Sequence, residues 1–441
     1  MNKQNRWMVA LALAAAGIGS ASILSLAPLM AQSGKAEVTI WLDQNGDPAC
    51  ETKNFVDVFN REGKLATIKA SIRKNSWDAT KIALAAGAGP DIVTTPGPGF
   101  LGEVAKAGQL LPLDEYGWTK ALAPWALSLG NFDGKLYGLP NEVETLVLYY
   151  NKTLFAKRGW KAPRTMDELV SLAATIKAAG LIPFAHANAE WKPANEWFVG
   201  EFLNHGAGSQ AVYEALTGKR RWDDPAFVKA IETLDKLQKD GTFMGGLDRY
   251  YTATFVQAVT ALGDGKATMK IEGTWVVGDL VKSFGAKAKN TNDWDWVPMP
   301  ASDGKASFNI GIGSTASINK NTKNPAAAAE VLNYMFQPKV QARMLNECGT
   351  VPGPISLPKT GLGKVDKRLQ AILAQLDKAA RANSYGYTTW TFFPPKTEQV
   401  LIKEIEKVWN GSMTAKEYLG EIQKQFDLDT KAGSGLPIPK R

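Results

Sequence analysis

The 441-residue sequence has few of the side chains that usually build metal and nucleophilic sites. It contains two histidines, His186 and His205, and two cysteines, Cys50 and Cys348. Neither histidine stands at a spacing typical of metal ligands, so we interpret both as structural. The Gly-x-Gly at Gly311 is not continued by a Walker or Rossmann pattern. The sequence therefore predicts no metal, no cofactor and no enzyme.

The chain also lacks blocks of one charge. Its 51 Lys and Arg residues are interspersed with 43 Asp and Glu residues, giving a formal net charge of +8. Without a basic patch, the sequence predicts no nucleic-acid partner. Hydrophobic residues make up 45% of the chain, an ordinary share for a globular protein. A chain of this length is longer than a single hydrophobic core usually supports, which predicts two domains.

After the N-terminal region, the sequence contains no long apolar run. Within the N-terminal region, Lys3 and Arg6 precede an apolar stretch that begins at Trp7, and small residues continue to Ala31. This order predicts a secretory signal peptide over residues 1–31, with an uncleaved membrane anchor as the alternative. No cysteine lies near the cleavage zone, which argues against a lipid anchor. We therefore expect a soluble, exported protein in a periplasmic or extracytoplasmic compartment.

The expected export of the protein affects the oxidation state of its two cysteines. An oxidising compartment and an even number of cysteines predict one disulfide, Cys50–Cys348. Two unpaired buried thiols are the alternative. A bridge would require the chain to return to its first domain near residue 350.

The stretch from Gly138 to Asn151 is the most informative part of the sequence. A turn at Leu139-Pro140 is followed by an apolar and aromatic run, which predicts a strand buried on both faces. Two carboxylates, Glu142 and Glu144, lie at its start. A charge at such a place is costly unless it has a use.

Three segments around this strand carry a resemblance: DGKLYGLP (133–140), LVLYYNKTLF (146–155) and APRTMDEL (162–169). Together they resemble the sugar-binding extracytoplasmic solute-binding proteins of ABC transporters, the maltose-binding-protein-like group (family 1). The resemblance covers about residues 36 to 428. It implies an α/β, type II-like periplasmic-binding-protein fold with two discontinuous lobes and three hinge crossings. It also implies a monomer that binds its ligand between the lobes and docks on ABC transporter permease subunits.

On this basis the chain divides into consecutive segments. We expect a signal peptide (1–31), lobe 1 (36–144), lobe 2 (145–297), a return to lobe 1 (298–350), a C-terminal helical segment mainly in lobe 2 (351–430) and a disordered tail (431–441). The resemblance places the second crossing at residues 294–300 and the third at 348–354.

The candidate ligand residues of lobe 1 follow predicted strands. Asp43 and Gln44 follow the strand at residues 38–42, where α/β sheets gather their ligands, although the same loop has turn chemistry. Thr95 and Gly97 lie in a loop rich in Pro and Gly, which brings backbone close to whatever it faces. Glu144 aligns with a cleft carboxylate of the family, whereas Glu142 has no such match.

The candidates in lobe 2 are mainly aromatic, because a ring face suits the apolar face of a sugar. Trp191 lies in a polar loop, with loop packing as its alternative role. Trp275 ends a Gly-x-Trp motif whose tryptophan stacks on sugar in the family, whereas Trp197 is interpreted as core. The resemblance adds Gly311, Tyr387 and Trp390, from a glycine stretch and an aromatic segment that border the cleft.

We therefore expect the substrate-binding component of an ABC carbohydrate importer, which captures a mono- or oligosaccharide by hinge closure. The first alternative is a two-lobe binder of a non-sugar solute, either a polyamine or an anion. The second is an exported glycosidase, which would also need carboxylates and aromatic rings.

Overall fold

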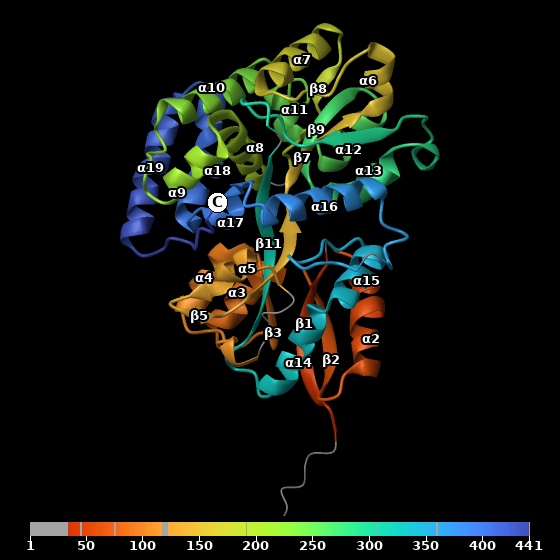
Figure 1. Cartoon of the computed structure of the whole chain (residues 1–441), viewed down its shortest axis with the longest axis vertical. Coiled ribbons are helices and arrows are strands. Elements are labelled where there is room, and N and C mark those ends of the chain that lie inside the picture. Colours follow the sequence, from red (N-terminus) through yellow and green to blue (C-terminus); the bar gives the residue numbers. More distant parts are fainter. Residues whose placement is uncertain are drawn as a thin grey trace, which may run out of the picture. The chain divides into compact units, whose positions relative to one another are not determined.

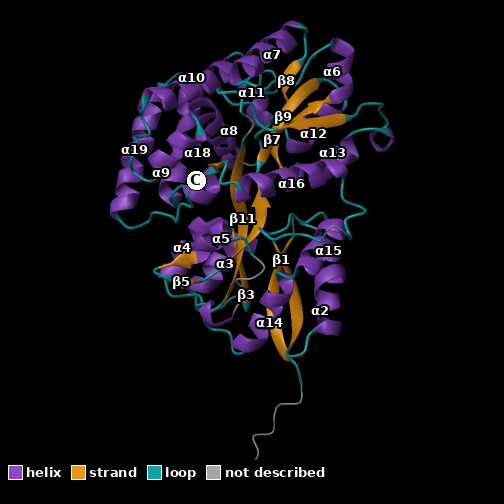
Figure 2. Cartoon of the chain, in the orientation of Figure 1, coloured by secondary structure: helices purple, strands orange, loops and turns teal. Residues whose placement is uncertain are grey.

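The computed structural model describes residues 34–44, 46–74, 76–116, 122–190, 192–305, 307–358 and 360–440. The predicted signal peptide and Trp191 lie outside these residues. Ala36–Arg441 forms one compact unit, in which helices cover two β-sheets (Figure 2). Within the described ranges, no helix is both long enough and apolar enough to cross a bilayer.

The larger sheet lies mainly in lobe 1, although the tyrosines of its edge strand β12 belong to the core of lobe 2. Among the described residues its strand order is β12-β11-β3-β1-β2, with β6 also paired to β11. β1 is parallel to β2 and β3, and β11 is antiparallel to β3 and β6. The strands are β1 (Ala36–Asp43), β2 (Ala66–Arg73), β3 (Ile92–Thr95), β6 (Leu139–Glu144), β11 (Phe308–Ile318) and β12 (Tyr385–Tyr387). A small hairpin consists of β4 (Asn131–Phe132) and β5 (Lys135–Leu136).

Alternation along β1 explains how lobe 1 packs. Val38, Ile40 and Leu42 point into the core, and the residues between them are less buried. They pack with helix residues such as Phe59 and Leu332. The lobe 1 helices are α1 (Pro48–Glu51), α2 (Asp57–Glu62), α3 (Ser76–Ala85), α4 (Gly97–Lys106), α5 (Pro124–Leu127), α14 (Pro325–Met335) and α15 (Pro338–Cys348).

The smaller sheet defines lobe 2. Its order is β10-β7-β9-β8, with bounds β7 (Leu146–Asn151), β8 (Ile182–Phe184), β9 (Ala267–Gly273) and β10 (Trp294–Val297). The helices are α6 (Lys152–Arg158), α7 (Met166–Ala178), α8 (Asn195–Phe202), α9 (Ser209–Leu216), α10 (Pro225–Lys239), α11 (Leu247–Thr252), α12 (Phe255–Gly263), α13 (Val277–Ser283), α16 (Lys367–Arg381), α17 (Thr389–Phe392), α18 (Pro395–Trp409) and α19 (Ala415–Lys431). Local sequence sets several of their starts: Thr254 with Gln257 caps α12, and Thr414 with Glu417 caps α19.

Two strand segments connect the lobes. The predicted strand from Gly138 to Asn151 is divided at Thr145 into β6, which pairs with β11, and β7, which pairs with β9 and β10. The second connection differs from the prediction, because β10 remains within the lobe 2 sheet. Instead, β11 extends from one lobe into the other (Figure 1). Its start pairs with β12, and its remainder pairs with β3 and β6.

The chain leaves lobe 1 again after α15. Cys348, the last residue of this helix, forms a disulfide with Cys50 in α1. Residues 349–366 carry the chain to α16, whose Leu369, Ile372 and Leu376 belong to the core that contains β7 and β9. The disulfide therefore joins the first and the last helix of lobe 1.

The C-terminal tail differs from the predicted disordered segment. The hydroxyls of Tyr385 and Tyr387 donate to the carbonyls of Lys440 and Pro439, each at 2.9 Å. Ile438 also packs against the core of lobe 2. The Gly/Ser/Pro composition that predicts disorder does not reveal these tyrosine contacts, which come from a segment about 50 residues earlier.

Candidate functional site

Three partly buried tryptophans of lobe 2 gather beside the connections between the lobes. Trp197 lies in the first turn of α8, Trp275 follows β9, and Trp390 lies in α17. The ring centroids of Trp197 and Trp275 are 5.2 Å apart, and those of Trp275 and Trp390 are 6.4 Å apart. We call these three residues the aromatic wall. Their tilted and edge contacts leave ring surface that other groups can cover.

Glycines allow the connecting strands to approach this wall. A Cβ on Gly311 would lie 3.0 Å from Cζ2 of Trp390, and one on Gly313 would lie 2.2 Å from Oε1 of Glu144. Gly97 has φ +75°, and a Cβ there would lie 3.4 Å from the carbonyl oxygen of Trp390. The glycines thus serve close packing around Trp390 and Glu144.

Several carboxyls next to the aromatic wall hold protons more tightly than usual. Burial raises the pKa of Glu144 well above its ordinary value, the charge of Glu142 adds to this, and the Trp390 indole offsets part of it. Burial also raises the pKa of Glu196 well above its ordinary value and that of the neighbouring Glu398 to about 7. Neutral carboxyls of this kind can donate as well as accept hydrogen bonds.

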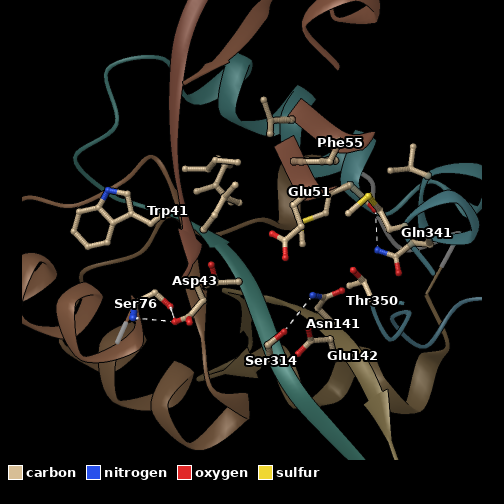
Figure 3. A pocket seen from close by; sticks show the side chains of 18 of the residues that line it. Trp41, Asp43, Glu51, Phe55, Ser76, Asn141, Glu142, Ser314, Gln341 and Thr350 are labelled. Carbon is tan, nitrogen blue, oxygen red and sulfur yellow. Dashed lines mark hydrogen bonds between the residues drawn. The ribbon is translucent and has the colours of Figure 1, made fainter. Parts of the chain in front are cut away.

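Lobe 1 contains a cavity of about 200 Å³ next to the carboxyl end of β1 (Figure 3). Its acidic side chains are Asp43, Glu51 and Glu142, and the described residues that line it include no Lys, Arg or His. Phe55 is among its apolar walls, and the indole of Trp41 lies at its edge. We call this space the acidic cavity.

The polar groups of the acidic cavity are partly tied together. Asp43 Oδ2 accepts hydrogen bonds from the backbone N and the hydroxyl of Ser76 at 3.1 and 2.5 Å. Asn141 donates to the hydroxyl of Ser314 at 3.1 Å. The carboxyl of Glu51 points into the cavity (Figure 3), and burial together with the charges of Glu142, Asp47 and Asp43 raises its pKa to about 7.

Strand β6 links the acidic cavity to the aromatic wall. Glu142 lines the cavity, whereas Glu144 lies against Gly313 and Trp390. Two residues apart on a regular strand would share a face, but Glu142 has φ +56°, which breaks the regular alternation. This unusual backbone conformation directs the two carboxylates to different surroundings.

A family model for bacterial extracellular solute-binding proteins matches residues 59–342, which is more than half of the chain. The chain belongs to this family. The resemblance found in the sequence is thereby confirmed.

This solute-binding protein has relatives along most of its length. A probable sugar-binding periplasmic protein of Brucella suis is 22% identical over 93% of this chain and 97% of its own. The diacetylchitobiose binding protein of Streptomyces coelicolor is 24% identical over 77% of this chain and 73% of its own.

Solved structures support the two-lobe fold. One, from work on xylan utilization by Caldanaerobius polysaccharolyticus, is 25% identical with a TM-score of 0.75, and covers 88% of this chain and 99% of its own. A chitin oligosaccharide binding protein is 22% identical with a TM-score of 0.73, and covers 90% of this chain and 100% of its own. The predicted fold class is confirmed.

The structure brings some of the candidate residues of this solute-binding protein together. Trp275, Trp390, Gly311 and Glu144 meet at the aromatic wall, and Asp43 lines the acidic cavity. The other candidates of known position lie elsewhere or inward: Gln44 is exposed, Gly97 packs against β11, and Thr95 and Tyr387 are buried.

Thr95 and Tyr387 differ most from their predicted role. Both are 0% exposed. The Thr95 hydroxyl pairs with that of Thr315, and the Tyr387 ring stacks against Tyr213. Neither side chain presents surface to a ligand in this structure, because each completes a core where two segments meet.

Sequence reasoning missed Trp197, which it assigned to the core beside Phe198. In the first turn of α8, Phe198 is 1% exposed, whereas Trp197 is partly exposed and packs on Trp275. It also missed the cavity residues Glu51 and Trp77. A helical wheel of α8 separates the two adjacent aromatics by about 100°, a signal that could have found Trp197.

Proposed function

We propose that this protein is the substrate-binding component of an ABC carbohydrate importer. It captures a mono- or oligosaccharide between its lobes by hinge closure, acts outside the cytoplasm as a monomer, and delivers the sugar to permease subunits in the membrane. It binds without catalysis.

The observation that carries this proposal is the aromatic wall with Glu144 beside it. The three tryptophans supply apolar ring faces, and Glu144 supplies a hydrogen-bonding group at their edge. A sugar ring combines an apolar C–H face with hydroxyls at its rim, so its chemistry is complementary to this arrangement. The names of the two relatives and two structures described above, all of which refer to sugars or polysaccharides, support the same class of ligand.

The acidic cavity favours one alternative, a cationic solute. Its described lining residues include three with carboxyl groups and none with a cationic side chain, although the chain as a whole carries a net charge of +8. A polyamine or an amino sugar would neutralise these groups, whereas an anion would be repelled. The cavity thus argues against the anion that the sequence left open.

A thermal-shift screen tests the proposal. The protein is titrated with xylobiose, N,N′-diacetylchitobiose, glucosamine, spermidine and phosphate, because a ligand that binds only the folded state raises Tm with concentration. We expect a dose-dependent rise with at least one saccharide and none with phosphate. A rise with spermidine alone would replace the sugar by a cation. Release of monosaccharide during incubation would contradict binding without catalysis.

Trp275→Ala locates the site. Removing this ring should raise the Kd of the sugar roughly 30-fold, the equivalent of ~2 kcal/mol of apolar burial. The matched control is Trp160→Ala, because Trp160 is also partly buried in lobe 2 but packs on Phe155. Equal losses of affinity in both variants would contradict a site at the aromatic wall.

A further inference from the structure

Strand β9 carries two charged side chains inside the core of lobe 2. All seven of its residues are buried, and both Lys270 and Glu272 are 1% exposed. As residues i and i+2 of a strand, they point to the same face. Lys270 Nζ lies 3.0 Å from Glu272 Oε2, so the two form a buried ion pair.

A contribution to the stability of the folded state does not explain why this ion pair is buried. Two buried charges lose their hydration, and apolar residues of similar volume often serve the folded state as well or better. The ring of Phe255, whose centroid lies 5.2 Å from Lys270 Nζ, shows that apolar groups pack beside this pair. A buried ion pair in such a place calls for a role other than stability.

The contacts around this ion pair connect it to the aromatic wall. Lys270 Nζ also donates to the carbonyl of Ala185 at 3.0 Å and lies 5.2 Å from the ring centroid of Phe255. Glu272 uses its second oxygen differently: Oε1 accepts a hydrogen bond from the indole N–H of Trp275 at 3.1 Å. The carboxylate therefore lies between an ammonium in the core and a tryptophan of the aromatic wall.

The indole of Trp275 is held at a second point. A Cβ on Gly273 would lie 2.2 Å from the Trp275 ring, so the ring rests directly on the backbone of that residue. The hydroxyl of Tyr149, itself 0% exposed, donates to the carbonyl of Gly273 at 3.2 Å. With one edge on Glu272 and one face on Gly273, the plane of the indole is fixed.

We propose that Lys270 and Glu272 are positioning residues, whose buried ion pair fixes the Trp275 indole in the orientation that binds the ligand. The inference rests on the proposed function, because Trp275 is the ligand platform in it. A charged acceptor suits this task better than a neutral one, since hydrogen bonds to an ionised carboxylate are the stronger kind. Lys270, 3.0 Å away, pairs with this carboxylate and holds it in place.

The test replaces the pair in the full chain. The double variant Lys270→Met with Glu272→Met supplies apolar side chains of similar length, so we expect Tm to stay equal or rise. We also expect the Kd for the saccharide identified by the screen to rise about 10-fold, because the indole is no longer held. The control replaces the same residue types in the exposed pair of α19, Lys424→Met with Glu421→Met, and should leave Kd unchanged.

A readout without ligand separates this inference from the proposed function. The indole ¹⁵N–¹H resonance of Trp275, assigned with Trp275→Phe, should move to lower proton frequency in the double variant as its hydrogen bond to Glu272 is lost. A wild-type resonance in the double variant would overturn the inference even if sugar binding were confirmed. If no saccharide bound the wild-type protein, the proposed function would fail, and the resonance would still report whether the pair orients the indole.

A double-mutant cycle completes the test. In a Trp275→Phe background the indole N–H is absent, so replacing the pair should have little further effect on Kd. Full additivity of the two changes would overturn the inference. Should the double variant fail to fold, Glu272→Gln keeps an acceptor of the same shape, and we expect it to give a smaller change in the resonance and in Kd.

Discussion

The two lobes offer a ligand opposite kinds of surface. In lobe 2 the aromatic wall is partly exposed, whereas Lys270 and Glu272 are buried in the core and form an ion pair with each other. In lobe 1 the carboxyls of Asp43, Glu51 and Glu142 line the acidic cavity, and the described lining residues include no Lys, Arg or His. One lobe therefore presents apolar rings, and the other presents carboxyl groups.

This difference suggests that the two lobes recognise different features of the ligand. Ring stacking depends on shape and tolerates many sugars, whereas carboxylates select ligands by the position of hydroxyl or ammonium donors. Strand β6 joins the two surfaces, because its Glu142 belongs to one and its Glu144 to the other. The contrast between the lobes can therefore be tested by changing each one separately.

The largest expected effect comes from breaking the disulfide of lobe 1. The bridge closes a sequence separation of 298 residues. Glu51, next to Cys50, and Thr350, two residues after Cys348, line the acidic cavity. Cys50→Ser with Cys348→Ser should destabilise the protein by about 2–5 kcal/mol. Hydrogen exchange should accelerate in β1 and β2 and remain slow in β9.

Reduction of the wild-type protein is the control, and it should reproduce the same pattern. Equal acceleration in both lobes would show that they unfold as one cooperative unit. The stability of the acidic cavity would then not be separable from that of the aromatic wall.

A smaller effect is expected from Glu144→Gln, compared with Glu142→Gln. In Glu144→Gln one carboxyl oxygen, which can accept a hydrogen bond in either protonation state, becomes an NH₂ group that only donates. Loss of one hydrogen bond to a sugar hydroxyl should raise the Kd for a neutral saccharide about 5- to 10-fold. Glu142→Gln should change this Kd less, because Glu142 lies on the side of the acidic cavity. Isothermal titration calorimetry measures both constants.

The reverse order of effects on Kd would contradict these separate roles of the two lobes. If Glu142→Gln weakened binding of a neutral sugar more than Glu144→Gln, the acidic cavity would be the main hydroxyl-binding surface. The wall would then serve packing within lobe 2, as its mutual ring contacts already permit.

The sequence predicted the elements of the fold well. The β-rich run at residues 38–42 identified β1, and the apolar run after Leu139-Pro140 identified the strand that forms β6 and β7. These features are local, so neighbours in the sequence determine them. The passage of β11 between the lobes was missed because its pairing with β12 depends on residues about 75 positions away.

The site was less predictable, because exposure is a property of the packed chain. Tyr387 and Trp390 belong to the same aromatic segment, yet one is 0% exposed and the other is part of the aromatic wall. Periodicity cannot separate them in a segment without a regular repeat. The lysine and glutamate inside β9 were the overlooked signal, because a buried strand holds charges only where they are paired.

The smallest expected effect is a pH dependence that originates in the acidic cavity. The pKa of Glu51 is raised from 4.5 to about 7 in the folded protein. The folded state therefore binds this proton more tightly than the unfolded state, and the resulting stability is present below pH 4.5 and lost as pH rises through about 7. Tm of the ligand-free protein should fall over this range, and Glu51→Gln should make the fall less steep.

The same titration tells the two classes of ligand apart. As Glu51 loses its proton, the acidic cavity gains negative charge, so a polyamine, which stays cationic over this range, should bind more tightly at pH 7.5 than at pH 5.5. A neutral saccharide held mainly by the aromatic wall should show a nearly constant Kd. If Glu51→Gln removed the pH dependence for spermidine and left xylobiose binding unchanged, the cavity would be a subsite for a cationic group. An unchanged pH profile for spermidine would instead leave recognition to the wall and Glu144.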